Sequence, residues 1–140
     1  IHLSMNGIRI THIHPVKPDD PRGMTFEVFK GRPGRQVVAI TRKAGQTFAG
    51  HFHTGKDRSK NPEKFFLISG EIRLDAWDGR TGEKAQIILQ AGDQLDIGAG
   101  VWHEMKAFTD AVFIEYRESV FDPENEDTIR DKDAYEKWVK

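Results

Sequence analysis

An alternation of apolar and polar residues with a period of two dominates the sequence, and glycine, proline and aspartate interrupt it at short intervals. Such alternation is typical of β-strands that face a core on one side and water on the other. The strand-like stretches are 8–14, 24–30, 35–43, the region around 51–53, 64–77 across Gly70, 85–90, 94–98, 101–108 and 111–119. A helix is indicated only near 131–140, where Ala134, Tyr135, Trp138 and Val139 form an apolar stripe. Eight to ten short strands and one terminal helix predict an all-β barrel or sandwich.

The chain has 140 residues, which is the usual size of one domain. Its 21 Lys and Arg against 22 Asp and Glu give a formal charge of -1, so no overall field favours nucleic acid or a membrane surface. The absence of cysteine excludes disulfides and thiolate metal sites and is compatible with a cytoplasmic protein. We expect neither a membrane span nor a signal peptide. Met5 is the candidate natural start, with 1–4 as an expression remnant.

Two histidines, His51 and His53, stand one residue apart on an expected strand. Residues i and i+2 of a strand point to the same face about 6.6 Å apart, so both rings can converge on one ion while Phe52 packs on the other face. A third histidine, His103, follows a glycine-rich turn, and Glu63 supplies a carboxylate. Three imidazole nitrogens and one carboxylate suit Fe, Mn, Ni, Co or Zn, whereas Mg and Ca prefer oxygen ligands. The pattern predicts a divalent transition metal without choosing which.

The spacing of these residues resembles the cupin superfamily. Its first motif, G(x5)HxH(x3–4)E(x6)G, is matched by Gly45, His51, His53, Glu63 and Gly70, with a longer gap before the glutamate. The resemblance implies a single cupin domain over 1–140, a jelly-roll β-barrel with a short C-terminal helix. The metal ligands that it implies are His51, His53, Glu63 and His103. A surface or hydrogen-bonding role of Glu63 is the alternative, because the long gap can shift its register.

The second cupin motif, G(x5)PxG(x2)H, is also matched. Its positions are Gly92, Gly98 in place of the proline, Gly100 and His103, and Ala107 stands where an asparagine is common. Both motifs occur in the family's order and at compatible distances, so the resemblance extends over most of the chain.

A narrower similarity, from Asp20 to about Val139, is to the sugar-nucleotide 3,4-ketoisomerases. These cupins isomerise nucleotide-linked 4-keto-6-deoxysugars in bacterial polysaccharide pathways. The matching pieces are DPRG at 20–23, Arg35, GVWHEM at 100–105 and DTIRDKDAYEKWV at 127–139. That group is thought to use barrel histidines as acid and base without a metal, and it typically carries glutamine where this chain has Glu63. A metal-free isomerase and a metal-loaded cupin therefore both remain open.

Basic and aromatic residues are candidates for binding substrate. The spacer after His53 carries Lys56, Arg58 and Lys60, which could hold a diphosphate or form only a solvated loop. Arginines on strands can bind phosphate with two hydrogen bonds, as lysine cannot. Aromatic residues such as Phe65 serve either as core or as a platform for a base or sugar. The candidate substrate contacts are Arg35, Arg73, Lys56, Trp102 and Tyr116.

The candidate catalytic residues are His51, His53 and His103. A nitrogen that ligates a metal cannot also act as a base, so a metal-loaded site requires another group. Tyr116, Glu104 and His12 are the candidates for that base. The second HxH pair, formed by His12 and His14, has no accompanying glutamate and is interpreted as a solvated or hydrogen-bonded pair on a strand.

The function predicted from these features is a metal-binding isomerase or epimerase acting on a nucleotide-linked keto sugar in bacterial polysaccharide biosynthesis. An Fe(II)-dependent cupin dioxygenase would use the same ligands with open positions for substrate and oxygen. A non-catalytic cupin that binds a sugar or effector would keep the barrel and need no proton transfer. Because small cupins often pair N-terminal strands, the segment 8–14 also predicts a homodimer.

Overall fold

The computed structural model describes residues 5–140, so the expected remnant at 1–4 lies outside the described residues. Ten strands fall within this range, which confirms the predicted all-β class. Two single 3₁₀ turns, η1 (Arg58–Lys60) and η2 (Pro123–Asn125), and one helix, α1 (Lys132–Trp138), complete the chain. The strands are β1 (Ile8–His12), β2 (Gln36–Arg42), β3 (Thr47–His53), β4 (Glu63–Ser69), β5 (Glu71–Asp78), β6 (Glu83–Gln90), β7 (Asp93–Ile97), β8 (Trp102–Ala107), β9 (Ala111–Arg117) and β10 (Thr128–Ile129).

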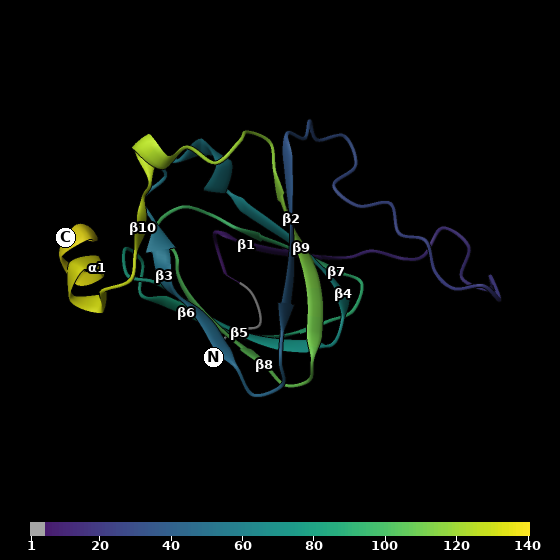
Figure 1. Cartoon of the computed structure of the whole chain (residues 1–140). Coiled ribbons are helices and arrows are strands. Elements are labelled where there is room, and N and C mark those ends of the chain that lie inside the picture. The colour runs from purple at the N-terminus through teal and green to yellow at the C-terminus, as the bar shows by residue number, and fades with distance from the viewer. Residues whose placement is uncertain (1–4) are drawn as a thin grey trace.

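The strands form two antiparallel five-stranded sheets that face each other across one interior. One sheet has the order β1-β7-β4-β9-β2 and the other has the order β10-β3-β8-β5-β6. Figure 1 shows the two sheets closing around a common interior, which is the jelly-roll arrangement of a cupin barrel. Alternate residues of each strand fill that interior, as the burial of Ile72, Leu74 and Ala76 on β5 shows.

Residues 64–77 do not form one strand, which corrects the expectation of a single strand across Gly70. The chain leaves one sheet at the end of β4 and enters the other at the start of β5. Gly70 makes this crossing with a φ of 97°, and a Cβ there would collide with the carbonyl of Asp110. Only glycine combines that backbone conformation with that close approach.

The expected strand at 24–30 is also wrong, because its backbone pairs with no neighbouring strand. Its aromatic side chains instead cover the outer face of the β4–β9 sheet: Phe26 packs on Phe66 with ring centroids 5.4 Å apart, and Phe29 stacks on Tyr116 at 4.5 Å. The segment belongs to an irregular arm over residues 13–35 that extends from the barrel on the side away from α1 (Figure 1).

The predicted terminal helix is confirmed. Asp131 caps its N-terminus by accepting a hydrogen bond from the backbone N–H of Asp133 at 2.9 Å. Tyr135 is fully buried, its ring lies 4.5 Å from that of Phe52, and its hydroxyl donates to the carbonyl of Gly100 at 2.6 Å. The helix thereby seals the outer face of the sheet whose inner face carries the histidines.

Within residues 5–140 no helix is long and apolar enough to cross a membrane. β1 lies at an edge of its sheet, where a further strand could pair. The homodimer through 8–14 stays a prediction.

Candidate functional site

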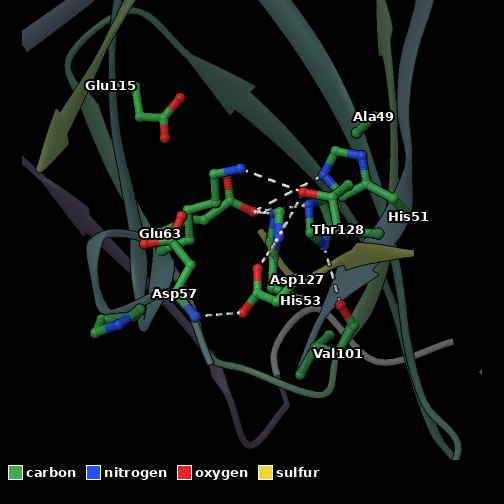
Figure 2. A network of polar contacts seen from close by, with 12 residues as sticks. Ala49, His51, His53, Asp57, Glu63, Val101, Glu115, Asp127 and Thr128 are labelled. Carbon is green, nitrogen blue, oxygen red and sulfur yellow. Dashed lines mark hydrogen bonds and ion pairs between the residues drawn. The ribbon is translucent and has the colours of Figure 1, made fainter. Parts of the chain in front are cut away.

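Three strands bring the predicted cluster together inside the barrel. β3 contributes His51 and His53, its neighbour β8 contributes His103 directly opposite His51, and β4 contributes Glu63 from the facing sheet. Figure 2 shows His51 and His53 turned toward the Glu63 carboxylate, and Nε2 of His103 lies 3.1 Å from its Oε1. The cluster therefore bridges the two sheets.

A β-bulge sets the direction of the histidine pair. The register between β3 and β8 shifts between Ala49 and His51, and Ala49 and Gly50 have φ angles of 65° and 68°. A left-handed alanine costs of order 1 kcal/mol or more, and such residues cluster at functional sites. Bulges of this kind re-aim side chains next to active sites.

Four buried ligand atoms meet at one point. Oε1 of Glu63 lies 2.6 Å from Nε2 of His53, 3.1 Å from Nε2 of His103 and 3.9 Å from Nε2 of His51. Among the residues that the structure describes, none of these four atoms has a hydrogen-bond partner of acceptable geometry. Buried polar atoms are normally paired. The group, with all its ligand atoms within 4.8 Å of one another, could hold a metal ion.

The outward-facing nitrogens of two histidines are held by acceptors. Nδ1 of His103 donates to the carbonyl of Val101 at 3.0 Å, and Nδ1 of His53 lies 3.2 Å from Oδ1 of Asp127. Thr128 also contacts Nδ1 of His53, at 3.1 Å. A proton held on Nδ1 leaves the Nε2 lone pair of a neutral ring free for a metal.

His51 differs from the other two. Its Nδ1 lies 3.1 Å from a guanidinium nitrogen of Arg130, a group that can only donate hydrogen bonds. Nδ1 of His51 therefore accepts, and the neutral ring carries its proton on Nε2, inside the cluster. The three histidines are held in two different tautomers.

Burial and neighbouring charges shift the pKa values of the cluster in opposite directions. Burial would raise the pKa of Glu63, but the three surrounding imidazoles outweigh it and hold the pKa well below its ordinary value. Burial lowers the pKa of His51. Burial also acts to lower the pKa of His53, but the Glu63 carboxylate, followed by Asp127, raises it overall. The Glu63 carboxylate thus stays ionised beside imidazoles that differ in basicity.

The long spacer folds so that Glu63 keeps its place. Asp57 caps the η1 turn, accepting hydrogen bonds from the backbone N–H and hydroxyl of Ser59 at 3.0 and 2.7 Å. Asp127 accepts from the backbone N–H groups of Gly55 and Asp57 at 2.9 and 3.0 Å. The loop is thus fastened to the same carboxylate that contacts His53.

The cluster opens into a cavity of about 120 Å³ inside the barrel. Besides the cluster residues His51, Glu63 and His103, its polar lining consists of Arg42 and Glu115. The remaining lining is Ile40, Phe48, Ala49, Phe65, Met105 and Phe113. Glu115 projects toward the cluster from above in Figure 2.

A second, cationic pocket adjoins the cluster through the segment around β10. It has a volume of about 430 Å³ and is lined by Lys60, Arg117, Phe121, Glu126, Thr128 and Arg130. Thr128 and Arg130 are the residues that contact Nδ1 of His53 and His51. Phe121 has the Lys60 ammonium 4.8 Å and the Arg117 guanidinium 5.5 Å from its ring centroid. We call this the cationic pocket.

None of the five predicted substrate contacts lines either of these two spaces. Arg35 and Lys56 are exposed. Arg73 faces outward, where it donates to Asp75 at 3.0 Å. Trp102 is buried beneath α1 beside Tyr135, and the Tyr116 hydroxyl donates to the carbonyl of Arg32 at 2.6 Å under the arm.

The candidate bases are likewise outside the cavity. Glu104 is exposed on the outer face of β8 and accepts a hydrogen bond from the Trp102 indole at 3.0 Å. His12 is paired with Asp93 at 2.9 Å at the edge of the barrel, next to His14. Tyr116, under the arm, also lies outside the cavity. None of the three candidate bases therefore lines the cavity, and the base has to be another residue.

Sequence reasoning missed Asp127, Arg130 and Glu115. Asp127 and His53 are 74 positions apart, and no spacing rule links them. Glu115 did have a signal, because it continues the buried parity of Ala111 and Phe113 on an otherwise apolar strand. A charged residue at an interior position of a strand indicates a functional or paired group.

Comparison with known families identifies one that covers most of the chain. The family described as the polysaccharide biosynthesis C-terminal domain matches residues 18–129. The chain belongs to this family. Comparison with curated protein sequences gives no match.

Solved structures with the same fold include sugar-nucleotide enzymes. A mutant of the 3,4-ketoisomerase QdtA from Thermoanaerobacterium thermosaccharolyticum, in complex with TDP-4-keto-6-deoxyglucose, is 18% identical, with a TM-score of 0.74 over 97% of this chain and 96% of that chain. A 3,4-ketoisomerase from Helicobacter canadensis is 22% identical, with a TM-score of 0.74 over 97% and 98%. The dTDP-6-deoxy-D-glucose-3,5-epimerase RmlC from Legionella pneumophila is 18% identical, with a TM-score of 0.70 over 97% and 79%. These similarities confirm the predicted cupin fold.

Proposed function

We propose that this member of the polysaccharide biosynthesis family is an isomerase or epimerase that acts on a nucleotide-linked keto sugar. The observation that carries the proposal is the convergence of His51, His53, Glu63 and His103 on one point beside an internal cavity. Isomerisation and epimerisation next to a carbonyl both begin with loss of a carbon-bound proton. That step needs a base within hydrogen-bond reach and a stabiliser for the charge that develops on the carbonyl oxygen.

The cationic pocket supports a substrate that carries phosphate. Lys60, Arg117 and Arg130 place three cations on its lining, against the single carboxylate of Glu126. Phe121 adds an aromatic face on which a nucleobase can stack. Clefts of roughly 300 to 1,000 Å³ are the usual size for small-molecule sites. A nucleoside diphosphate held here would place its sugar toward the histidine cluster. The reason is that Arg130 lines the cationic pocket and also contacts His51, which lines the cavity.

We further propose that the cluster binds a divalent transition metal. The four unpartnered ligand atoms fit such an ion, and the donor set of three imidazoles and one carboxylate suits Fe, Mn, Ni, Co or Zn. When bound, the ion would polarise the keto oxygen and stabilise the charge that forms on it. Val101 and Asp127 would hold the His103 and His53 rings in the ligating tautomer.

The test uses the purified full chain, loaded with each candidate metal, under nitrogen in deuterated water. It is incubated with dTDP-, UDP- and GDP-linked 4-keto-6-deoxysugars, and NMR follows the carbon next to the keto group. We expect deuterium at that carbon. No exchange with any of these sugars would refute the proposal, and oxygen consumption by the iron-loaded protein would then favour a dioxygenase.

A further inference from the structure

We propose that Glu115 is the carboxylate that takes the carbon-bound proton from the substrate. The inference rests on the function proposed above and deepens it, because it assigns the base that a metal-loaded cluster lacks. No sequence motif includes Glu115. Its inward parity on β9 and its place in the cavity lining indicate the role.

Two observations place Glu115 inside the barrel: the alternation of buried residues along β9, and its place in the lining of the cavity. On β9 it shares the inward face with Ala111 and Phe113, whereas Tyr116 belongs to the outward face. It is 6% exposed and lines the cavity that also contains His51, Glu63 and His103. Its register partner on β4 is Phe65, two positions after Glu63. A substrate carbon in this cavity would be within reach of Glu115 on one side and the cluster on the other.

The other polar groups of the cavity are unsuited to the role. The Nε2 atoms of His51 and His103 and Oε1 of Glu63 converge on one point, so an ion there would occupy them. Arg42 carries a guanidinium, which is not deprotonated in proteins. Glu115 is the one proton acceptor left among the residues lining this cavity within the described chain.

The Glu115 carboxylate is held in a fixed orientation. Nε of Arg117 donates to its Oε1 at 3.0 Å. The side-chain hydrogen bond to this carboxylate within residues 5–140 goes to Oε1, which leaves Oε2 available to a ligand. Because Arg117 also lines the cationic pocket, phosphate binding and orientation of the base share one residue.

The electrostatic surroundings agree with this role. Burial raises the pKa of Glu115, the charge of Glu63 raises it further, and Arg117 offsets part of the shift. A carboxylate whose pKa lies closer to neutrality is a stronger base than an ordinary glutamate and returns its proton more readily.

In the proposed step, Oε2 of Glu115 accepts the proton from the carbon next to the keto group. The electron pair of the broken carbon–hydrogen bond forms the carbon–carbon double bond of an enediolate, and the carbonyl pair moves to oxygen. In an isomerisation the carboxylic acid then gives a proton to the former carbonyl carbon. The hydroxyl proton of the neighbouring carbon moves to the enediolate oxygen, and that neighbouring carbon becomes the new carbonyl, with no net oxidation or reduction.

Glu115→Gln tests this role, because it keeps the shape of the side chain and removes the base. We expect deuterium exchange into the keto sugar to fall by about 100-fold or more, the usual contribution of general base catalysis. Metal content by elemental analysis and nucleoside diphosphate affinity should stay within twofold of the unaltered protein. Glu115→Asp keeps a carboxylate and should retain more exchange than Glu115→Gln. The matched control is Glu104→Gln on the outer face of β8, which should exchange at the normal rate.

The possible failures are distinguishable. Normal exchange by Glu115→Gln, with the unaltered protein active, would overturn the role of Glu115 and leave the proposed function standing. An inactive Glu115→Gln that has also lost its metal would overturn it too, because the residue would then act on the ion. No exchange by the unaltered protein would overturn both proposals.

Discussion

The guanidinium of Arg130 donates a hydrogen bond to Nδ1 of His51 over 3.1 Å, while Nε2 of the same ring faces Oε1 of Glu63 at 3.9 Å. Because Nδ1 accepts, the neutral ring has its proton on Nε2, and that tautomer cannot ligate a metal through Nε2. Coordination by His51 therefore requires Arg130 to withdraw from the ring. Metal affinity and the position of Arg130 are linked.

Arg130→Ala should strengthen metal binding by about tenfold, because loss of a competing contact of roughly 1.4 kcal/mol corresponds to that factor. Zinc competition against a chromophoric chelator measures the change. Arg58→Ala, an exposed arginine in the spacer, is the control for the loss of one positive charge. Equal affinities in all three proteins would show that Arg130 does not oppose ligation.

Glu63→Gln should weaken metal binding by at least about tenfold, because a charged oxygen ligand becomes a neutral amide. The barrel should remain folded by circular dichroism, since Glu63 forms no hydrogen bond of good geometry with the described residues at Oε1. Elemental analysis after dialysis gives the metal content. Unchanged occupancy in this variant would remove Glu63 from the ligand set.

Asp127→Asn should reduce metal affinity by about 10- to 100-fold, the usual effect of changing the hydrogen-bond partner of a ligating histidine. The amide oxygen can still accept from the N–H groups of Gly55 and Asp57, but its NH₂ group would then face Nδ1 of His53. His53 would shift its proton to Nε2. Nitrogen-15 NMR of the imidazoles reports the tautomer, and a retained Nδ1 proton would contradict the prediction.

Lys60→Ala should weaken binding of UDP by about 10- to 150-fold, because a charged hydrogen bond is worth roughly 1.5 to 3 kcal/mol. Lys56→Ala is the matched control, since both lysines lie in the same spacer but only Lys60 lines the cationic pocket. Calorimetric titration at two salt concentrations measures both. A larger loss of UDP affinity in Lys56→Ala than in Lys60→Ala would show that the exposed part of the loop binds the phosphate.

Tyr135→Phe should lower the free energy of unfolding by about 1 to 3 kcal/mol, because it leaves buried backbone groups without a partner. The hydroxyl accepts from the N–H of Gly79 at 2.8 Å and donates to the carbonyl of Gly100 at 2.6 Å. Urea unfolding gives the change, and the metal content should not alter. An unchanged midpoint would show that water replaces both contacts.

The barrel and most of the cluster could be predicted because they depend on short-range patterns. Alternation places His51 and His53 on one face of β3, and the same rule places His103 on the inner face of β8. The apolar stripe of α1 follows from a period of 3.6 around Tyr135. These inferences need only the local chain.

The polar groups that contact the cluster lie on a segment far from the histidines in the sequence. No local pattern predicts that this segment folds back onto β3. β10 is two residues long, yet it places Thr128 beside His53 and brings the neighbouring Asp127 and Arg130 to the histidines. Arg73, on an expected strand, is predicted as a substrate contact if its side chain points inward, and Tyr116 is predicted as a substrate contact as well. Their parity turns both side chains out of the barrel.

The bulge at Ala49 and Gly50 also shows how the site can be lost in evolution. Ala49 pairs with Glu104 and His51 pairs with His103, so β3 carries one extra residue between these two pairs. Straightening the bulge without removing that residue would shift the rest of β3 by one position and exchange the faces of His51 and His53 with that of Phe52. An aromatic ring would then lie in the lumen, and two imidazoles would lie under α1. A lineage can thus lose the histidine cluster while almost all of its amino-acid sequence still looks familiar.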